Sequence, residues 1–166
     1  MIPVTLIMAT TIDGKIAKNS NHFANWTSPE DKKSFVEISK EFGLIMMGSK
    51  TFDTFSSPLK NRLNVVFSEK EGAPQDNVLW VKGEPGNVLK NLEKMGYKKA
   101  LLGGGASLNT IFLKKKLINE IILTIEPKIF GSGISLFNED FDIDLELLEI
   151  KKINKNSYQV RYKVNY

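Results

Sequence analysis

Short apolar runs alternate with helix-forming segments along most of this 166-residue chain, and this alternation limits the fold more than any other feature. The runs are rich in β-branched residues and bounded by turn residues, which is typical of buried strands. Repeated strand–helix–strand order favours a mainly parallel sheet covered by helices on both faces. The predicted strands are Val4–Thr11, Leu44–Met47, Asn64–Phe67, Val78–Val81, Ala100–Leu102 and Glu120–Ile125. The predicted helices are Pro29–Glu41, a short one from Ser49, Pro85–Met95 and Ala106–Leu113.

The end of the chain follows a different pattern. Phe141–Ile150 alternates acidic with apolar residues, and Tyr158–Tyr166 alternates again after a turn-like segment at 154–157. Alternation with period two on both sides of a turn predicts an antiparallel hairpin at a sheet edge. We therefore expect a single α/β domain over residues 1–166, with a central, mostly parallel sheet flanked by helices and a C-terminal antiparallel hairpin.

Composition excludes several kinds of site. The chain has no cysteine and one histidine, His22, which rules out disulfides, thiolate sites and multi-histidine metal sites. No apolar run approaches the roughly 20 residues of a membrane span. The N-terminus has no basic segment before its apolar stretch, so we expect a cytoplasmic protein without a membrane partner. The net charge of +4 is explained by ordinary lysine decoration, and no interleaved aromatic–basic pattern predicts a nucleic-acid partner.

Asp31 is an acid on the apolar side of the first predicted helix. It precedes Phe35 by four residues and so shares the stripe that Phe35 begins, whereas Glu30 falls on the polar face. If Ser28 is the N-cap, Asp31 can close a capping box; if Thr27 is the N-cap, Glu30 closes it and Asp31 is free. The helix pattern alone leaves both open. A carboxylate beside apolar side chains is a candidate ligand for an amidine-like ring edge.

Two predicted strands run directly into glycine and then into a helix. Gly48 follows the first of these strands, and Gly103, Gly104 and Gly105 follow the second. Glycine lets a ligand approach the backbone, and a helix N-terminus offers unpaired N–H groups to an anion. We therefore expect these two turns to hold the two ends of a dinucleotide.

Taken together, the motifs resemble the dihydrofolate reductase family over nearly the whole chain, in order and spacing. Trp26, Asp31 and Phe35 match the family's tryptophan, pterin-binding acid and substrate-packing phenylalanine. Further matching segments are Leu6–Ala9, Ile12–Ile16, Met47–Phe52, Pro58–Asn64 and Leu102–Gly105. The resemblance implies a dihydrofolate reductase-like fold and reduction of dihydrofolate to tetrahydrofolate by hydride transfer from NADPH. It also implies that the loop from Thr11 to Trp26 acts as a lid and that the proton arrives through water.

The resemblance implies a role for each matching residue. Catalytic roles are expected for Asp31, Trp26 and Thr124. The residues expected to contact dihydrofolate are Ile7, Met8, Asp31, Phe35, Phe55 and Arg62, with the arginine clamping the carboxylate of the folate tail. Those expected to contact NADPH are Ala9, Ile16, Gly48, Ser49, Lys50, Thr51, Phe67, Ser68, Gly103, Gly104, Gly105, Ala106, Ser107 and Leu108. No metal is expected, and the protein is expected to be a monomer or a homodimer.

A related branch, the pyrimidine reductase of riboflavin biosynthesis, is the alternative. Val4–Leu6, Thr27–Pro29 and Pro127–Phe137 are more similar to that branch, which acts on a ribosylamino-pyrimidine phosphate. The acid at Asp31 and the lack of a lysine near Ile7 favour a folate substrate. Two departures concern the cofactor, because Ser49 and Ala106 stand where many relatives have arginines for the 2′-phosphate of NADPH.

Overall fold

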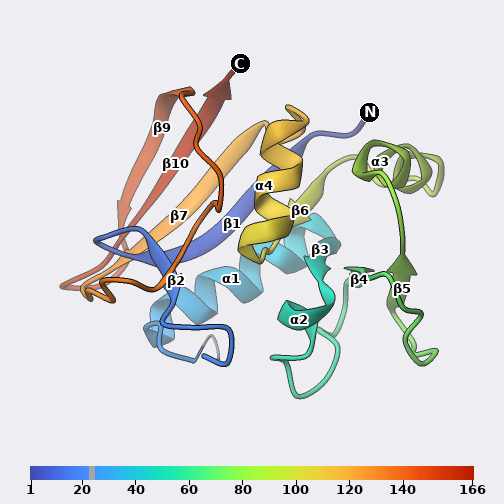
Figure 1. The fold of residues 1–166 in the computed structure, drawn as a ribbon, viewed down its shortest axis with the longest axis horizontal. Helices are drawn as coiled ribbons and strands as arrows, with labels where there is room; N and C mark the ends of the chain where they lie inside the picture. The colour runs from blue at the N-terminus through green and yellow to red at the C-terminus, as the bar shows by residue number, and fades with distance from the viewer. Residues whose placement is uncertain (23–24) are drawn as a thin grey trace.

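The computed structural model describes residues 1–22 and 25–166. Eight strands form one sheet in the order β5-β4-β3-β6-β1-β7-β10-β9, and β2 pairs with β8 in a second sheet (Figure 1). Neighbours from β5 to β7 pair in parallel, whereas β10 is antiparallel to both β7 and β9. The strands are β1 Val4–Thr11, β2 Lys15–Ala17, β3 Leu44–Gly48, β4 Leu63–Phe67, β5 Val78–Val81, β6 Ala100–Leu102, β7 Glu120–Glu126, β8 Ile134–Ser135, β9 Asp144–Lys152 and β10 Tyr158–Asn165. The helices are α1 Pro29–Phe42, α2 Ser49–Phe52, α3 Pro85–Lys94 and α4 Ala106–Lys114. The expected α/β architecture with a C-terminal hairpin is confirmed.

Both faces of the parallel sheet are buried, which explains why its strands are apolar throughout. Alternate residues of each strand point to opposite faces, so Leu6 and Met46 join the core under α3 and α4. Their neighbours Ile7 and Met47 join the core under α1 and α2. Phe112 of α4 is fully buried in the first core. The carboxyl ends of β1, β3, β6 and β7 are left at one edge of this sandwich, where ligands bind in open α/β sheets.

The C-terminal hairpin differs in detail from the predicted one. The strand predicted at Phe141–Ile150 begins three residues later, at Asp144, because Phe141 packs into the core under α4. Every residue of β9 is exposed, and the ladder with β10 is irregular between Arg161 and Tyr162. The small sheet of β2 and β8 was not predicted from the sequence, since each strand has only two or three residues.

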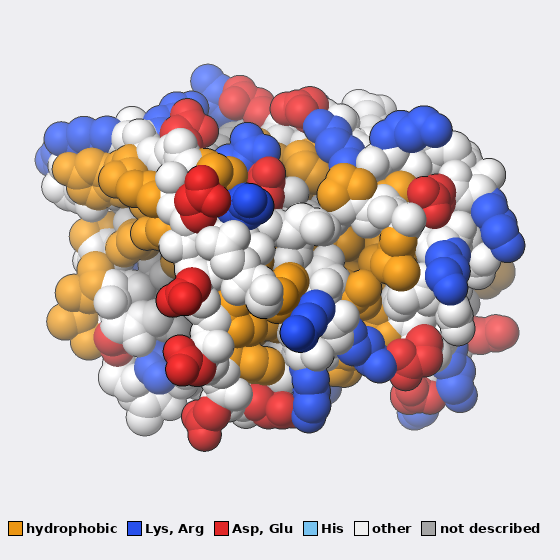
Figure 2. Space-filling view, turned by 90° about the horizontal axis from the view of Figure 1, so that it is seen from above, with side chains coloured by type: hydrophobic (Ala, Val, Ile, Leu, Met, Phe, Trp, Pro, Cys, Tyr) orange, Lys and Arg blue, Asp and Glu red, His pale blue; other side chains and the backbone are white. Residues whose placement is uncertain are grey.

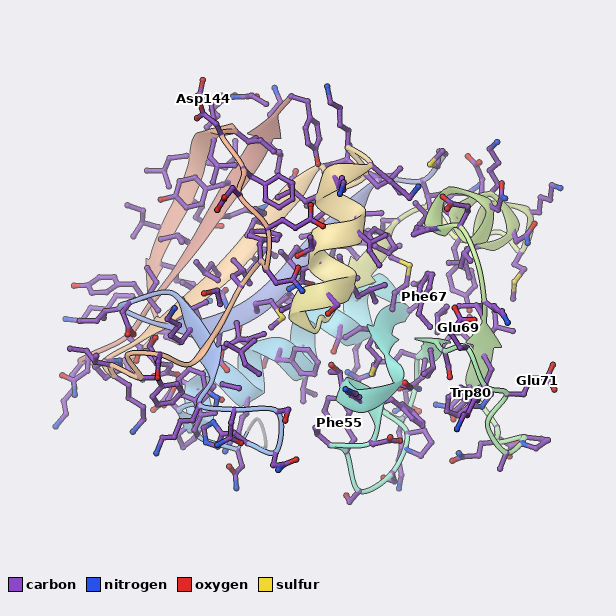
Figure 3. All side chains as sticks on the ribbon, viewed as in Figure 1. Phe55, Phe67, Glu69, Glu71, Trp80 and Asp144 are labelled. Carbon is purple, nitrogen blue, oxygen red and sulfur yellow. The ribbon has the colours of Figure 1, made fainter. Side chains whose placement is uncertain are left out.

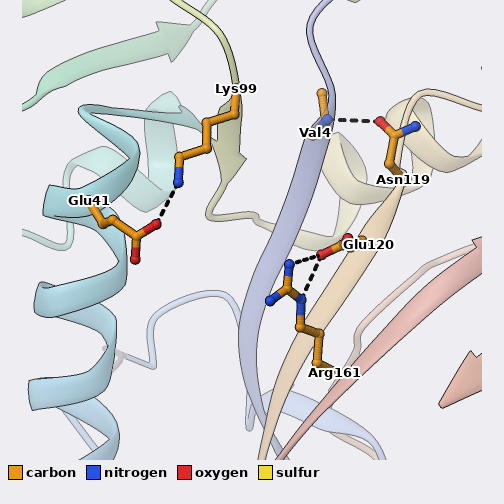
Figure 4. Close-up of polar contacts among 6 residues, drawn as sticks. All are labelled: Val4, Glu41, Lys99, Asn119, Glu120 and Arg161. Carbon is orange, nitrogen blue, oxygen red and sulfur yellow. Dashed lines mark hydrogen bonds and ion pairs between the residues drawn. The ribbon is translucent and has the colours of Figure 1, made fainter. Parts of the chain in front are cut away.

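Beside the hairpin, the α1 side of the sheet carries charged side chains held in pairs (Figure 4). Arg161 on β10 binds Glu120 on β7 at 2.6 Å, and Lys99 binds Glu41 on α1 at 2.6 Å. These groups line a groove of about 380 Å³ between α1 and the strands β1, β7, β9 and β10. The groove bears charge of both signs, so its chemistry does not select one class of ligand.

Charge is also mixed on the face seen in Figure 2, where basic and acidic side chains are interspersed over the surface. That face therefore presents no continuous basic patch of the kind that binds a nucleic-acid backbone. In the described part of the chain, no helix has the length and apolar character needed to cross a membrane. Residues 1–22 and 25–166 also contain no group of three or more His, Cys, Asp or Glu side chains placed to hold a metal ion.

Candidate active site

The two glycine turns expected to receive a dinucleotide lie against each other at the carboxyl edge of the sheet. The N–H of Gly48 donates to the carbonyl of Gly104 at 2.9 Å, and the N–H of Gly103 donates to the carbonyl of Met46 at 2.8 Å. Thr51 faces the second turn, because a Cβ on Gly105 would lie 3.3 Å from its Oγ1. The structure thus joins the segments after β3 and β6 into one surface.

Close packing explains the absence of a side chain at two of these glycines without any bound ligand. A Cβ on Gly103 would lie 2.8 Å from Cδ1 of Ile45. Gly104 has φ of +91°, which disfavours a side chain, and a Cβ there would lie 2.9 Å from the sulfur of Met8. The peptide bond between Gly104 and Gly105 is cis. The run of glycine is therefore not by itself an indication of a phosphate site.

A stronger indication comes from the start of α4. Gly105 is the N-cap and supplies no capping side chain, so the N–H groups of Ala106, Ser107 and Leu108 have no partner within the helix. Asn109, fully buried in the next position, donates from Nδ2 to the carbonyl of Leu136 at 3.1 Å. Its Oδ1 is the one buried side-chain nitrogen or oxygen in the described residues without a hydrogen-bond partner. A free acceptor and free donors at one helix start fit a polar ligand with both anionic and N–H groups.

Other residues expected to contact NADPH stand at the carboxyl ends of the neighbouring strands β3 and β4, where Gly48 is the register partner of Phe67. Lys50 is exposed, whereas Phe67 packs edge-on against Phe112 with ring centroids 5.7 Å apart. Ser68 follows β4, and its Oγ accepts the N–H of Lys70 at 3.1 Å. Figure 3 places Phe67 and Glu69 at the same end of β4, far from Asp144 at the opposite edge. Glu69 forms an ion pair with Lys82 at 3.0 Å, which offsets part of its charge.

Asp31 lies in the first turn of α1, and the structure decides between the two capping alternatives. Ser28 is the N-cap, and its Oγ accepts the N–H of Asp31 at 3.2 Å. The Asp31 carboxylate does not close the box, because the Ser28 N–H donates instead to Glu126 at 2.8 Å. The carboxylate is half-buried, and burial raises its pKa above the ordinary value of 3.8. Hydrogen bonds from the side chains of Thr124 and Thr27 partly offset that effect, while the charge of Glu126 adds to it.

Thr124 links Asp31 to the hairpin. It is 1% exposed on β7, opposite Ala9 of β1. Its Oγ1 accepts from Nε2 of Gln159 on β10 at 3.2 Å. The same Nε2 donates to Oγ of Ser34 on α1 at 3.0 Å. A polar chain of three elements therefore fixes the threonine that touches Asp31.

The apolar wall expected around the substrate is also assembled. Phe35 on α1 and Phe55 after α2 are nearly parallel, with ring centroids 6.5 Å apart. Both pack with Ile7 in the core under α1. Met8 lies on the other face of β1, against Gly104, so it borders the nucleotide turn instead of this wall.

Arg62 lies beside α1, and its guanidinium already donates hydrogen bonds to other groups of the protein. Its side chain is 7% exposed, and its Nε donates to the carbonyl of Lys60 at 3.0 Å. One terminal nitrogen donates to Oγ of Ser39 and, at 3.5 Å, to the carbonyl of Val36. Burial lowers the pKa of Arg62 below its ordinary value. The guanidinium therefore ties the 58–62 segment to α1, whatever else it binds.

Trp26 and Ile16 belong to the segment expected to form a lid. Nε1 of Trp26 donates to the carbonyl of Ile16 at 3.2 Å. The indole packs edge-on against Phe130 with ring centroids 4.9 Å apart. His22 contacts both rings, and its Nδ1 accepts the backbone N–H of Lys18 at 3.0 Å. These contacts join the segment to the 127–133 loop. Lid movement stays a prediction.

Sequence reasoning missed a buried carboxylate beside the start of α1. Glu126 is 3% exposed and accepts from the Oγ of Ser28 at 2.7 Å and the Oγ of Ser157 at 2.8 Å. The signal was present, because strand alternation places Glu126 on the same face as Thr124. The predicted strand ended at Ile125, one residue too early.

Two curated relatives cover different shares of the chain. The uncharacterized protein YyaP of Bacillus subtilis is 25% identical over 179 aligned residues, covering 98% of this chain and 95% of that protein. The dihydrofolate reductase of Ureaplasma parvum serovar 3 is 33% identical over 109 residues, covering 65% of this chain and 66% of that protein. The first likeness spans both chains almost completely, and the second spans about two thirds of each.

Solved structures share the fold at lower identity. A putative riboflavin biosynthesis protein from Shewanella sp. PV-4 has a TM-score of 0.82 at 22% identity, covering 99% of this chain and all of that one. Dihydrofolate reductase from Enterococcus faecalis, complexed with NADP(H), has a TM-score of 0.73 at 20% identity, covering 99% of this chain and 97% of that one. The dihydrofolate reductase-like fold is therefore confirmed.

The family model described as the RibD C-terminal domain matches residues 3–158, nearly the full length of the chain. The match agrees with the riboflavin-branch features at Val4–Leu6, Thr27–Pro29 and Pro127–Phe137. It identifies the family as that of the RibD C-terminal domain, whereas the sequence motifs had favoured dihydrofolate reductase itself. The chain belongs to the RibD C-terminal domain family, whose members have the dihydrofolate reductase-like fold described above.

Proposed function

We propose that this protein is an NADPH-dependent reductase that acts on dihydrofolate. The observation that carries the proposal is the half-buried carboxyl of Asp31 in the first turn of α1, one turn before Phe35, whose ring is stacked with Phe55. A carboxylate in that position accepts two N–H bonds from an aminopyrimidine ring edge, and such bidentate, charge-assisted contacts are strong. The aromatic wall supplies apolar contact for the ring itself.

The residues present fit a dinucleotide cofactor. The first turn of α4 offers N–H groups to its phosphates, and the unpartnered Oδ1 of Asn109 is an acceptor beside Gly104. NADPH, when bound, supplies the hydride. The chain's residues hold the pterin, exclude water through the 11–26 segment, and allow a proton from solvent to complete the reduction of the C=N bond. Asp31 orients and polarises the ring and does not itself deliver the proton.

The test is loss of the reduced-nicotinamide absorbance when purified protein is mixed with NADPH and dihydrofolate. Asp31→Asn keeps the size of the side chain and is expected to lower kcat/KM by about 100-fold, or about 2.7 kcal/mol of transition-state stabilisation. Glu30→Gln is the matched control, since Glu30 is exposed on the same turn and bonds only to Asn154 among its described neighbours. Equal activity of the Asp31→Asn variant and the wild type would refute the assignment.

A second candidate is reduction of a ribosylamino-pyrimidine phosphate. It is supported by the family match and by Arg62, whose guanidinium is largely committed to α1 instead of facing a folate tail. The two candidates separate in a head-to-head assay with both substrates at equal concentration. Turnover of the pyrimidine alone would replace dihydrofolate in the proposal while leaving the role of Asp31 intact.

A further inference from the structure

The most unusual feature of the site is a second buried carboxylate next to Asp31. Glu126 is 3% exposed, and none of the ion pairs among the described residues includes it. A buried carboxylate without a cation is costly unless hydrogen bonds replace its hydration. Glu126 has three such bonds, from the N–H and Oγ of Ser28 and from the Oγ of Ser157.

These bonds make Glu126 the distant half of a capping box. In an ordinary box, the acid three residues after the N-cap, here Asp31, reaches back to the N-cap N–H. In this chain that N–H is taken by a residue 98 positions away. Asp31 is thereby released from the helix end, and its carboxyl turns to Thr124 and Thr27.

We propose that Glu126 is a positioning residue of the ligand site: by capping α1 in place of Asp31, it frees the Asp31 carboxyl and holds it toward the bound heterocycle. This inference rests on the proposed function only in taking Asp31 as the ligand-binding acid. Glu126 itself need not touch substrate, cofactor or the reacting atoms. Its effect passes through Ser28 and the first turn of α1.

The position has an electrostatic consequence as well. The groups that act on the Asp31 carboxyl are burial, the hydroxyls of Thr124 and Thr27, the negative charge of Glu126 and the positive charge of Lys32. Glu126 raises the pKa of Asp31, and Lys32 on α1 lowers it. Removing the charge of Glu126 therefore lowers the pKa of Asp31. Shortening the Glu126 side chain instead frees the N–H of Ser28, which the Asp31 carboxylate can then accept.

Two variants separate charge from reach. Glu126→Gln keeps the length, because its amide oxygen can accept from Ser28 and its amide N–H can donate to the Ser157 hydroxyl. In this variant the titration of Asp31, monitored by NMR of its carboxyl carbon, is expected to shift to lower pH. KM is expected to change less than threefold. Glu126→Ala opens the Ser28 N–H and is expected to raise KM by about tenfold, with a smaller change in kcat. Glu120→Gln, also on β7 but paired with Arg161, is the control and should leave both quantities unchanged.

The NMR titration needs no turnover, so it tests the inference even if neither proposed substrate is reduced. An Asp31 titration that is the same in the wild type and Glu126→Gln overturns the electrostatic part. A folded Glu126→Ala protein with wild-type KM overturns the positioning part. If Glu126→Ala does not fold, Ser157→Ala takes its place, because it removes one bond to Glu126 without touching α1. A rise in KM for Ser157→Ala supports the inference, and an unchanged KM overturns it.

Discussion

Replacing Arg62 by leucine tests whether this guanidinium is a structural tie, a ligand clamp or both. The change removes the bond to the carbonyl of Lys60, the bond to Ser39 and the long contact to Val36. Ser39 keeps a bond to a helix carbonyl, so it is not orphaned. Two bonds from a charged donor, at about 1.5 kcal/mol each as the lower end of the range for charged groups, predict a loss of about 3 kcal/mol in unfolding free energy. At this chain length, that loss lowers Tm by about 6–12 °C.

Urea unfolding at constant pH measures the effect directly. Arg161→Leu is the matched control, because its ion pair with Glu120 is partly exposed and is expected to contribute less than about 1 kcal/mol. If the Arg62 variant is as stable as the control, the hydrogen bonds from Arg62 to α1 do not stabilise the fold, and the reasoning is refuted. Binding gives the second readout: a folate clamp predicts that dihydrofolate loses more affinity than a pterin without the tail. Equal losses for both ligands would leave Arg62 with the structural role only and favour the pyrimidine substrate.

Two further predictions concern stability. Burial raises the pKa of Asp31 above 3.8, so its contribution to stability is present below that pH and is lost as pH rises through the folded-state pKa. Asp31→Asn should therefore unfold at higher urea than the wild type near neutral pH, with the gap closing in acid and no such trend for Glu30→Gln. Gly104→Ala should destabilise more than Gly83→Ala: both have φ above +90°, but only the Cβ at 104 meets Met8, whereas nothing lies within 4 Å at 83. Unfolding of the two variants side by side, with NADPH affinity of each, checks that ranking.

Much of the fold could be predicted from the sequence because its signals are local. Period-two alternation and turn residues placed the strands within a few residues, and Pro29 marked the start of α1. The errors lie where distant packing decides. The strand predicted from Phe141 begins at Asp144 because the phenylalanine is drawn into the core under α4.

The site divides in the same way. Phe35 and Phe55 come together because the α1 stripe and the short connection after α2 present them to the same core, and Asp31 precedes Phe35 by one turn on that helix. Strand alternation puts Glu126 on the face of Thr124, but its partners could not be predicted from the sequence, since they are 98 and 31 positions away. The contacts assigned to dihydrofolate and NADPH stay predictions.

The cap at the start of α1 also has a consequence for assembly. A local capping box forms as soon as its own helix turn forms, but this one needs Glu126 from β7 and Ser157 from the turn before β10. Closing so long a loop costs entropy that is recovered only when the sheet is nearly complete. The first turn of α1 should therefore be among the last parts to become protected from amide exchange. Opening of the C-terminal hairpin would remove the Ser157 bond to Glu126 and so loosen the residue that caps that turn, from the far end of the chain.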